Sequence, residues 1–447
     1  MVCKENKFTV IDLFAGCGGL STGLEMAGFV PLLFSELDKD ARNTYIENRH
    51  SFIGNVPFKE CSSMHFGDVR DLSKQAVSRV QSELIDRLKN IDFNKYSGSS
   101  PDLLCGGPPC QGFSGIGHRR SYAVSKSDIP SNRLYERMID QIKNFSPKIF
   151  LFENVKGLMS ARWQPDGTKG EIFRDVLSAF RSIPNYQVCW SLVLSKDYGV
   201  PQNRPRLLLV GIRKDLLQFV PTLKNGGDDA IDNGCLPKPD YDVLDLFDLL
   251  SDLEDPEVPQ ALRDQNFWSP FKTSEYLNPP LNTVQERLRT TPKGYVMGKG
   301  DPLAEQDYSR HKSHVVSKFD VMIANGGEIP AEYKTKKFAQ RLLPKRWNNR
   351  GPFITTTSLP DDYVHFSQPR ILTVREWARL QTFPDWYGFR GNRTTGGLRR
   401  AGNPRAGVFE REVPKYTQIG NAVPVLLAEK IGRHFVKLLE LYRENAN

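Results

Sequence analysis

The chain has 447 residues, of which 39% are hydrophobic, 11% aromatic and 25% charged. These fractions are typical of a folded globular protein and exclude long disordered segments. The net charge of +9 favours a polyanionic partner, because surplus Lys and Arg attract phosphate backbones. Seven cysteines without a CxxC pair indicate a reducing compartment rather than a disulfide framework.

The amino-terminal segment is short and charged and does not resemble a signal peptide. No apolar stretch approaches the roughly 20 residues needed to cross a bilayer. We therefore expect a cytoplasmic protein without a membrane partner. The length indicates one large domain with an insertion, or two unequal domains.

Short apolar runs alternate with helical patterns through the first half of the chain, which predicts a doubly wound, mostly parallel α/β sheet. The predicted strands are Phe8–Leu13, Val30–Ser35, Pro101–Cys105, Lys148–Phe152, Gln187–Leu194 and Arg206–Ile212. Apolar residues recur at helical spacing between Leu134 and Phe145 and between Ile172 and Phe180.

The first predicted strand ends in a glycine-rich turn, Phe14-Ala15-Gly16-Cys17-Gly18-Gly19, before a helix begins. Glycines let a ligand approach the backbone, and a helix amino end presents unpaired N–H groups, so the turn indicates a nucleotide-type site. Ser21 stands where an NAD fingerprint has its third glycine, which weakens an NAD interpretation. Glu36 follows the second strand, where an acid can accept hydrogen bonds from ribose hydroxyls, and Asp68 could bind an adenine amino group.

Cys110 follows the predicted strand that ends at Cys105, within Gly107-Pro108-Pro109-Cys110-Gln111-Gly112. The two prolines restrict the backbone, so a stiff loop fixes the orientation of the thiol, as a nucleophile requires. The alternative is a small apolar residue in a turn, which is the commoner role of a single cysteine.

Further polar side chains are placed at strand ends. Glu153 ends a strongly apolar strand, where doubly wound folds bind ligands at the carboxyl edge of the sheet. Arg204 and Arg206 precede an apolar strand, and their guanidinium groups suit a carbonyl oxygen or a phosphate. Ion pairing with nearby acids is an equally good interpretation of the two arginines alone.

The βα rhythm stops after about Asp215. An acidic stretch from Asp228 to Glu257 contains one helical segment, Val243–Leu253, and its charge indicates a solvated face. The irregular, polar region from Asn278 to Pro369 indicates a separate small domain. A helix over Val425–Tyr442 is expected to pack back on the sheet.

Two basic runs, around 334–350 and 390–405, could each line a phosphate track or form a solvated surface. The first includes Lys336 and Lys337 beside aromatic residues, and the second lies in a glycine-rich stretch.

Taken together, the motifs resemble those of the DNA (cytosine-5)-methyltransferase family, of the bacterial restriction-modification type. The matching segments, in the family's order, are FAGCGG, Glu36, Asp68, GGPPCQGFS, ENVKGL, QNRPR, LTVREWARLQTFPD and QIGNAVP. The resemblance implies a catalytic domain over 1–239, a target recognition domain over 240–369, and a return to the catalytic domain over 370–447.

The resemblance also implies the catalytic roles. Cys110 would add to C6 of a flipped-out cytosine, Glu153 would bind N3 and the exocyclic amine, and Arg206 together with Arg204 would hold the carbonyl O2. C5 would then take the methyl group of S-adenosylmethionine (SAM).

For the cofactor and the DNA, the implied contacts are more numerous. The implied SAM-binding residues are Phe14, Gly16, Cys17, Gly19, Glu36, Leu37, Asp68, Pro109, Asn421 and Val423. The expected DNA contacts are Gln111, Ser114, Arg119, Arg120, Lys336 and Lys337. We predict no metal site.

The expected partner is double-stranded DNA, bound by a monomer that functions beside a cognate restriction endonuclease. One alternative is a transfer RNA cytosine-5 methyltransferase of the same family, which would share the chemical residues. Another is a catalytically inactive DNA-binding relative, against which the intact Cys110, Glu153 and Arg206 argue. An NAD-dependent oxidoreductase is disfavoured because it would not account for Pro109-Cys110.

Overall fold

The computed structural model describes residues 8–88, 100–109, 130–164, 166–224, 226–334, 340–346, 360–395 and 412–446. Its centre is a seven-stranded sheet in the order β5-β2-β1-β6-β7-β9-β8. The strands are β1 (Phe8–Leu13), β2 (Phe29–Ser35), β5 (His65–Phe66), β6 (Leu103–Gly106), β7 (Ile149–Val155), β8 (Tyr186–Leu194) and β9 (Pro205–Arg213). Neighbouring strands are parallel from β5 to β7, whereas β9 runs antiparallel to both β7 and β8.

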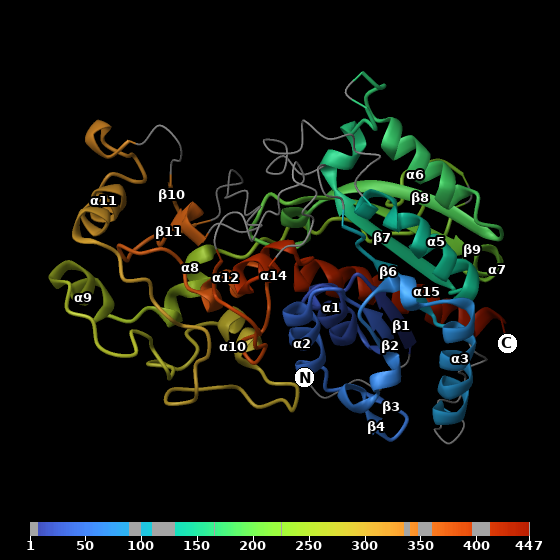
Figure 1. The fold of residues 1–447 in the computed structure, drawn as a ribbon, viewed down its shortest axis with the longest axis horizontal. Coiled ribbons are helices and arrows are strands. Elements are labelled where there is room, and N and C mark those ends of the chain that lie inside the picture. The colour runs from blue at the N-terminus through green and yellow to red at the C-terminus, as the bar shows by residue number, and fades with distance from the viewer. Residues whose placement is uncertain are drawn as a thin grey trace.

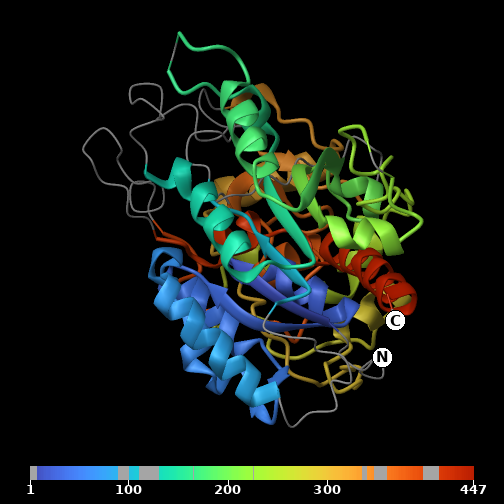
Figure 2. The ribbon, with the colours of Figure 1, turned by 90° about the vertical axis from the view of Figure 1, so that its right-hand side faces the viewer.

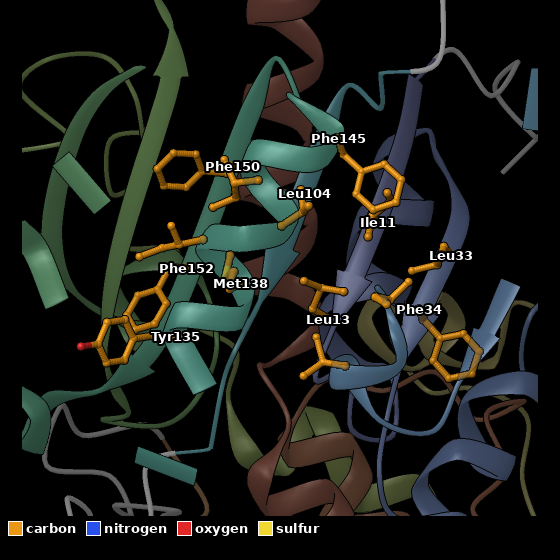
Figure 3. Packing of buried hydrophobic residues seen from close by; sticks show 14 of the residues in the cluster. Ile11, Leu13, Leu33, Phe34, Leu104, Tyr135, Met138, Phe145, Phe150 and Phe152 are labelled. Carbon is orange, nitrogen blue, oxygen red and sulfur yellow. The ribbon is translucent and has the colours of Figure 1, made fainter. Parts of the chain in front are cut away.

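Helices cover both faces of this sheet, as Figures 1 and 2 show. One face packs against α3 (Lys74–Leu88), α5 (Leu134–Phe145) and α6 (Glu171–Arg181), and the other against α1 (Gly19–Ala27), α7 (Lys214–Phe219) and α15 (Val425–Ala446). Successive residues of a strand face opposite cores. Leu104 and Phe150 pack with Met138 of α5 (Figure 3), whereas Leu103 and Ile149 pack into the core on the other face of the sheet. The doubly wound α/β fold expected from the sequence is thereby confirmed.

The first half of the chain also contains α2 (Lys39–Glu47) and a short hairpin of β3 (Phe52–Ile53) and β4 (Val56–Pro57). All six predicted strands are present, with ends that differ by at most three residues. The two-residue β5 at the sheet edge was not predicted. The two predicted helices between strands correspond to α5 and α6.

The described part of the region 240–369 lies to one side of the sheet in Figure 1. It holds α8 (Leu246–Leu250), α9 (Val258–Asp264), α10 (Thr283–Arg289), α11 (Ser313–Ala324), β10 (Arg341–Leu342) and β11 (Tyr363–Val364). The helix predicted over Val243–Leu253 begins three residues later. The domain boundaries themselves stay a prediction. Among the described residues, no helix combines the length and apolar character that crossing a bilayer requires.

The chain returns to the sheet through α12 (Val374–Leu380) and α14 (Lys415–Asn421). Buried ion pairs hold α12 in place, since the Arg379 guanidinium contacts Asp252 of the preceding region and Asp385, which follows the helix. Arg370 forms a second buried pair with Glu376 at 2.6 Å. Each of these buried charges has an oppositely charged partner, which is the condition under which buried ions are tolerated.

The final helix, α15, lies directly against α1 (Figure 1), because small residues allow the two backbones to approach. A Cβ at Gly23 would lie 2.4 Å from the Val425 carbonyl oxygen and 2.5 Å from the Ala428 Cβ. Farther along α15, a Cβ at Gly432 would lie 2.7 Å from that of Ala27. The carboxyl-terminal helix is therefore an integral part of the amino-terminal half of the fold, as the sequence predicted.

Replacing Gly23 by Ala tests this close approach. In an ordinary helix interior, Gly to Ala stabilises by about 1 kcal/mol. Here we expect a destabilisation of roughly 1–3 kcal/mol, because the added methyl group overpacks the contact with α15. The measurement is the urea unfolding midpoint at unchanged slope. Gly388→Ala is the control, since its Cβ would meet nothing within 4 Å; a higher midpoint for Gly23→Ala would contradict the expectation.

Candidate active site

The turn after β1 contains residues with a left-handed backbone. Phe14, Gly16 and Gly18 have φ values of 58°, 56° and 89°. Gly18 has no room for a side chain, since a Cβ there would lie 2.7 Å from the Tyr387 hydroxyl. Phe14 bears a conformational cost as a non-glycine residue in this region, which is a feature that functional sites often retain.

The Glu36 carboxylate lies against this turn. Its Oε2 accepts a hydrogen bond from the Gly16 N–H at 2.8 Å, and its Oε1 accepts one from the Asp38 N–H at 2.8 Å. Burial disfavours the charged form and raises the pKa of Glu36 to about 7, although both N–H groups oppose the shift. The strand order explains the contact, because β1 and β2 are neighbours and end at the same edge.

The carboxyl-terminal segment completes the surroundings of the turn. A Cβ at Gly19 would lie 2.5 Å from the Val423 carbonyl oxygen and 2.9 Å from the Ala422 Cβ. Asn421 ends α14 with an exposed side chain. Two segments from opposite ends of the chain thus meet at the amino end of α1, as the resemblance implied.

Three other predicted cofactor residues are oriented differently. The Cys17 side chain is buried, its Sγ donates to the Gln418 carbonyl at 3.3 Å, and burial raises its pKa to about 12. Leu37 is 70% exposed. Asp68 accepts hydrogen bonds from the Arg70 guanidinium, which lowers the pKa of Asp68. The Cys17 Sγ is directed to the Gln418 carbonyl and Asp68 is paired with Arg70. The cofactor roles of all three residues stay predictions.

Glu153 and Arg206 form a buried ion pair at the carboxyl edge of the sheet. The distance from Arg206 Nε to Glu153 Oε1 is 2.5 Å, and both side chains are largely buried. The antiparallel register places Arg206 opposite Val155, which brings the start of β9 beside the end of β7. Burial is the main cause that lowers the pKa of Arg206, while Glu153 opposes this shift.

The backbone that leads to Cys110 touches this pair. A Cβ at Gly107 would lie 2.8 Å from Glu153 Oε2, so only glycine leaves room for the carboxylate. Asn154 Nδ2 donates to the Pro108 carbonyl at 3.3 Å. Gly107 and Asn154 received no individual role from the sequence, although both lie inside the quoted motifs.

Pro109 is exposed at the end of this segment. The remaining predicted site residues lie outside the described residues, namely Cys110, Gln111, Ser114, Arg119, Arg120, Lys336 and Lys337.

Arg204 differs from Arg206 in its surroundings. Its side chain is 1% exposed, and its Nη2 donates to the carbonyl oxygens of Gly420 at 2.5 Å and Ala422 at 3.2 Å. Its side chain is thus directed toward the carboxyl-terminal segment. The expected contact of Arg204 with a base stays untested.

The two halves of the site are two strands apart. Leu13 of β1 is paired with Gly106 of β6, which is paired with Phe152 of β7. With neighbouring strands about 4.8 Å apart, the ends of β1 and β7 are separated by about 10 Å. A glycine-rich turn and an ion pair at the carboxyl edge of one open sheet are features of the doubly wound α/β class, in which ligands bind at this edge.

Comparison with known proteins identifies the family within this class. The profile of the C-5 cytosine-specific DNA methylase family matches residues 8–437, so the chain belongs to that family. It is a DNA cytosine-5 methyltransferase, as the sequence motifs predicted.

Curated relatives match along nearly the full chain. Type II methyltransferase M.DdeI of Desulfomicrobium norvegicum is 29% identical and covers 98% of this chain and 90% of its own length. Type II methyltransferase M.BsuRI of Bacillus subtilis is 28% identical, with 96% and 79% covered. The fold is also similar to a solved structure of a proposed DNA modification methyltransferase encoded within a prophage of E. coli. That comparison has a TM-score of 0.62 and 23% identity over 97% of this chain and 99% of the other.

Proposed function

We propose that the protein transfers a methyl group from SAM to C5 of one cytosine within a specific duplex DNA sequence. The observation that supports this reaction best is the Glu153–Arg206 pair, held against Gly107 three residues before Cys110. The relatives named Type II methyltransferases support a role beside a cognate restriction endonuclease. We further propose that the protein acts as a monomer in the cytoplasm.

The proposed chemistry begins at the target base. The Cys110 thiolate forms a bond to C6, and the electron pair of the C5–C6 double bond makes C5 nucleophilic. Glu153 binds N3 and the exocyclic amine, and Arg206 stabilises the charge that develops at O2. SAM would supply the methyl group that C5 attacks, with S-adenosylhomocysteine as the leaving group. Loss of the C5 proton to a base then restores the double bond and expels the thiolate.

The residues at the first turn fit a nucleoside-bearing methyl donor. The left-handed turn at Gly16 and Gly18 brings the backbone close to any ligand at this edge, and the Glu36 carboxylate can accept bonds from ribose hydroxyls. We propose that Phe14, Gly19 and Val423 form the rest of this pocket. Because the target base is stacked within the duplex, it must be flipped out before Cys110 can reach C6.

The decisive assay follows labelled methyl transfer from SAM to unmethylated duplex DNA and, separately, to transfer RNA. We expect incorporation into duplex DNA at C5 of cytosine in one short sequence, which methylation-sensitive sequencing would identify. Incorporation into transfer RNA alone would contradict the proposal, and the absence of any transfer would favour an inactive DNA-binding relative.

The raised pKa of Glu36 predicts a pH dependence of SAM binding. The ionised carboxylate is the better acceptor for ribose hydroxyls, and its pKa near 7 means that it is increasingly protonated below that pH. We therefore expect the Kd for SAM to rise as the pH falls from 8 to 6, measured by calorimetry without DNA. Glu36→Gln is the control and should bind weakly with a flatter profile; an identical profile in this variant would assign the dependence elsewhere.

The basic run near residue 334 predicts a salt-dependent contribution to DNA binding. Replacing Lys334, Lys336 and Lys337 by Gln should reduce the slope of log affinity against log salt, by up to about 0.9 for each phosphate that the variant no longer neutralises. Lys143→Gln, a change on α5, is the control. An unchanged slope in the triple variant would remove these lysines from the interface.

A further inference from the structure

The side chain of Arg204 links the base-binding edge to the carboxyl-terminal segment. Its Nη2 donates to the Gly420 and Ala422 carbonyls at 2.5 and 3.2 Å. Its backbone is fixed as well, since the Arg204 carbonyl accepts from the Ser195 N–H at 3.0 Å and from Ser195 Oγ at 3.1 Å. The guanidinium therefore reaches the 420–422 backbone from an anchored position.

The same backbone is held from a second direction by α12. Gln381, which caps the carboxyl end of α12, donates from Nε2 to the Ile419 carbonyl at 2.8 Å and to the Ala422 carbonyl at 3.3 Å. Gln202 orients that amide, because its own Nε2 donates to Gln381 Oε1 at 2.7 Å. All of these side chains are buried, so water does not replace their hydrogen bonds.

The segment held in this way forms one side of the glycine-rich turn. Ala422 and the Val423 carbonyl are pressed against Gly19 at the amino end of α1, where a Cβ would already clash. A small shift of the 420–422 carbonyls would therefore move the wall of the proposed SAM pocket. The Glu153–Arg206 pair, by contrast, is held by its own ion pair.

We propose that Arg204 and Gln381 are positioning residues for SAM binding, and that Arg204 is not a ligand of the target base. This inference rests on the proposed function, because it assigns the SAM pocket to the turn after β1. The two arginines of one short segment then have different roles. Arg206 binds the target cytosine, whereas Arg204 positions the backbone that borders the proposed SAM pocket.

The experiment compares Arg204→Lys, Gln381→Met and Arg206→Lys in the full chain. The Kd for SAM is measured by calorimetry without DNA, and covalent trapping on a duplex that carries 5-fluorocytosine is measured at saturating SAM. We expect Arg204→Lys and Gln381→Met to raise the Kd at least tenfold while trapping at saturating SAM stays within about twofold of the wild type. Arg206→Lys should show the reverse, with an unchanged Kd and reduced trapping.

The outcomes separate the inference from the proposed function. An unchanged Kd for Arg204→Lys together with reduced trapping at saturating SAM would overturn the inference. It would indicate instead that Arg204 contacts the target base. If Arg204→Lys does not fold, as judged by its melting temperature, Gln381→Met decides, and an unchanged Kd in that variant overturns the inference. A wild-type protein that binds no SAM would instead refute the proposed function.

Discussion

Replacing Cys110 by Ala is expected to abolish methyl transfer, with a loss of at least about 10⁴-fold in rate. The reason is chemical: without addition of a thiolate to C6, C5 of cytosine has too little nucleophilic character to attack a methyl group. The same variant should form no covalent complex with a duplex that carries 5-fluorocytosine. In the wild type that complex persists, because fluorine at C5 cannot leave as a proton.

Cys105→Ala is the matched control for this prediction. Cys105 is a buried cysteine in β6, five residues before Cys110 in the sequence, and its Sγ contacts Asp12 Oδ1 at 3.6 Å. Its loss should lower stability without preventing covalent trapping. A covalent complex in Cys110→Ala, or its absence from a folded Cys105→Ala protein, would contradict the assignment of the nucleophile.

The second large effect is expected at the Glu153–Arg206 pair. Replacing either residue by Gln should lower kcat by about 10²–10³-fold, the usual loss when one stabilising group is removed from a preorganised site. Each single variant also leaves a buried partner without its counter-charge, which typically costs about 3–5 kcal/mol in stability. Single-turnover rates and unfolding free energies must therefore be measured on the same preparations.

The double variant distinguishes a cooperating pair from two independent contributors. If the two side chains act as one unit, Glu153→Gln with Arg206→Gln should be no more than about tenfold slower than the slower single variant. Arg213→Gln is the control, since Arg213 is paired with Asp215 at the opposite end of β9. Multiplicative losses in the double variant, or a comparable loss in Arg213→Gln, would contradict the pairing.

Most of the main strands could be predicted from the sequence because they are buried on both faces and are therefore continuous apolar runs, whereas residues of the edge strand β8 alternate between buried and half-buried. The two-residue β5 gives no such signal, since its pairing with β2 depends on tertiary contacts alone. The reversed direction of β9 also has no signature in a single sequence. Yet this direction places Arg206 next to Glu153, because a parallel β9 would have put its first residues at the opposite edge.

Some residues of the candidate site could be placed from the sequence and others could not, for a related reason. Glu36 could be placed from the order of strands and its distance along the chain, and the structure puts it at the turn. The orientations of Cys17 and Arg204 could not be predicted, because they depend on the packing of the carboxyl-terminal segment, which is far away in the sequence. Sequence order identifies which residues gather at an edge, whereas tertiary packing decides which of them face a ligand.

The contact between α1 and α15 joins segments that are far apart in the sequence. The Arg443 guanidinium, in the last helix, lies 4.0 Å from the ring centroid of Phe8, the first residue of the first strand. A chain that ends before residue 425 lacks this helix and the residues that pack against Gly23. The last described helix and the first strand are therefore parts of one packed unit, although they come from opposite ends of the sequence.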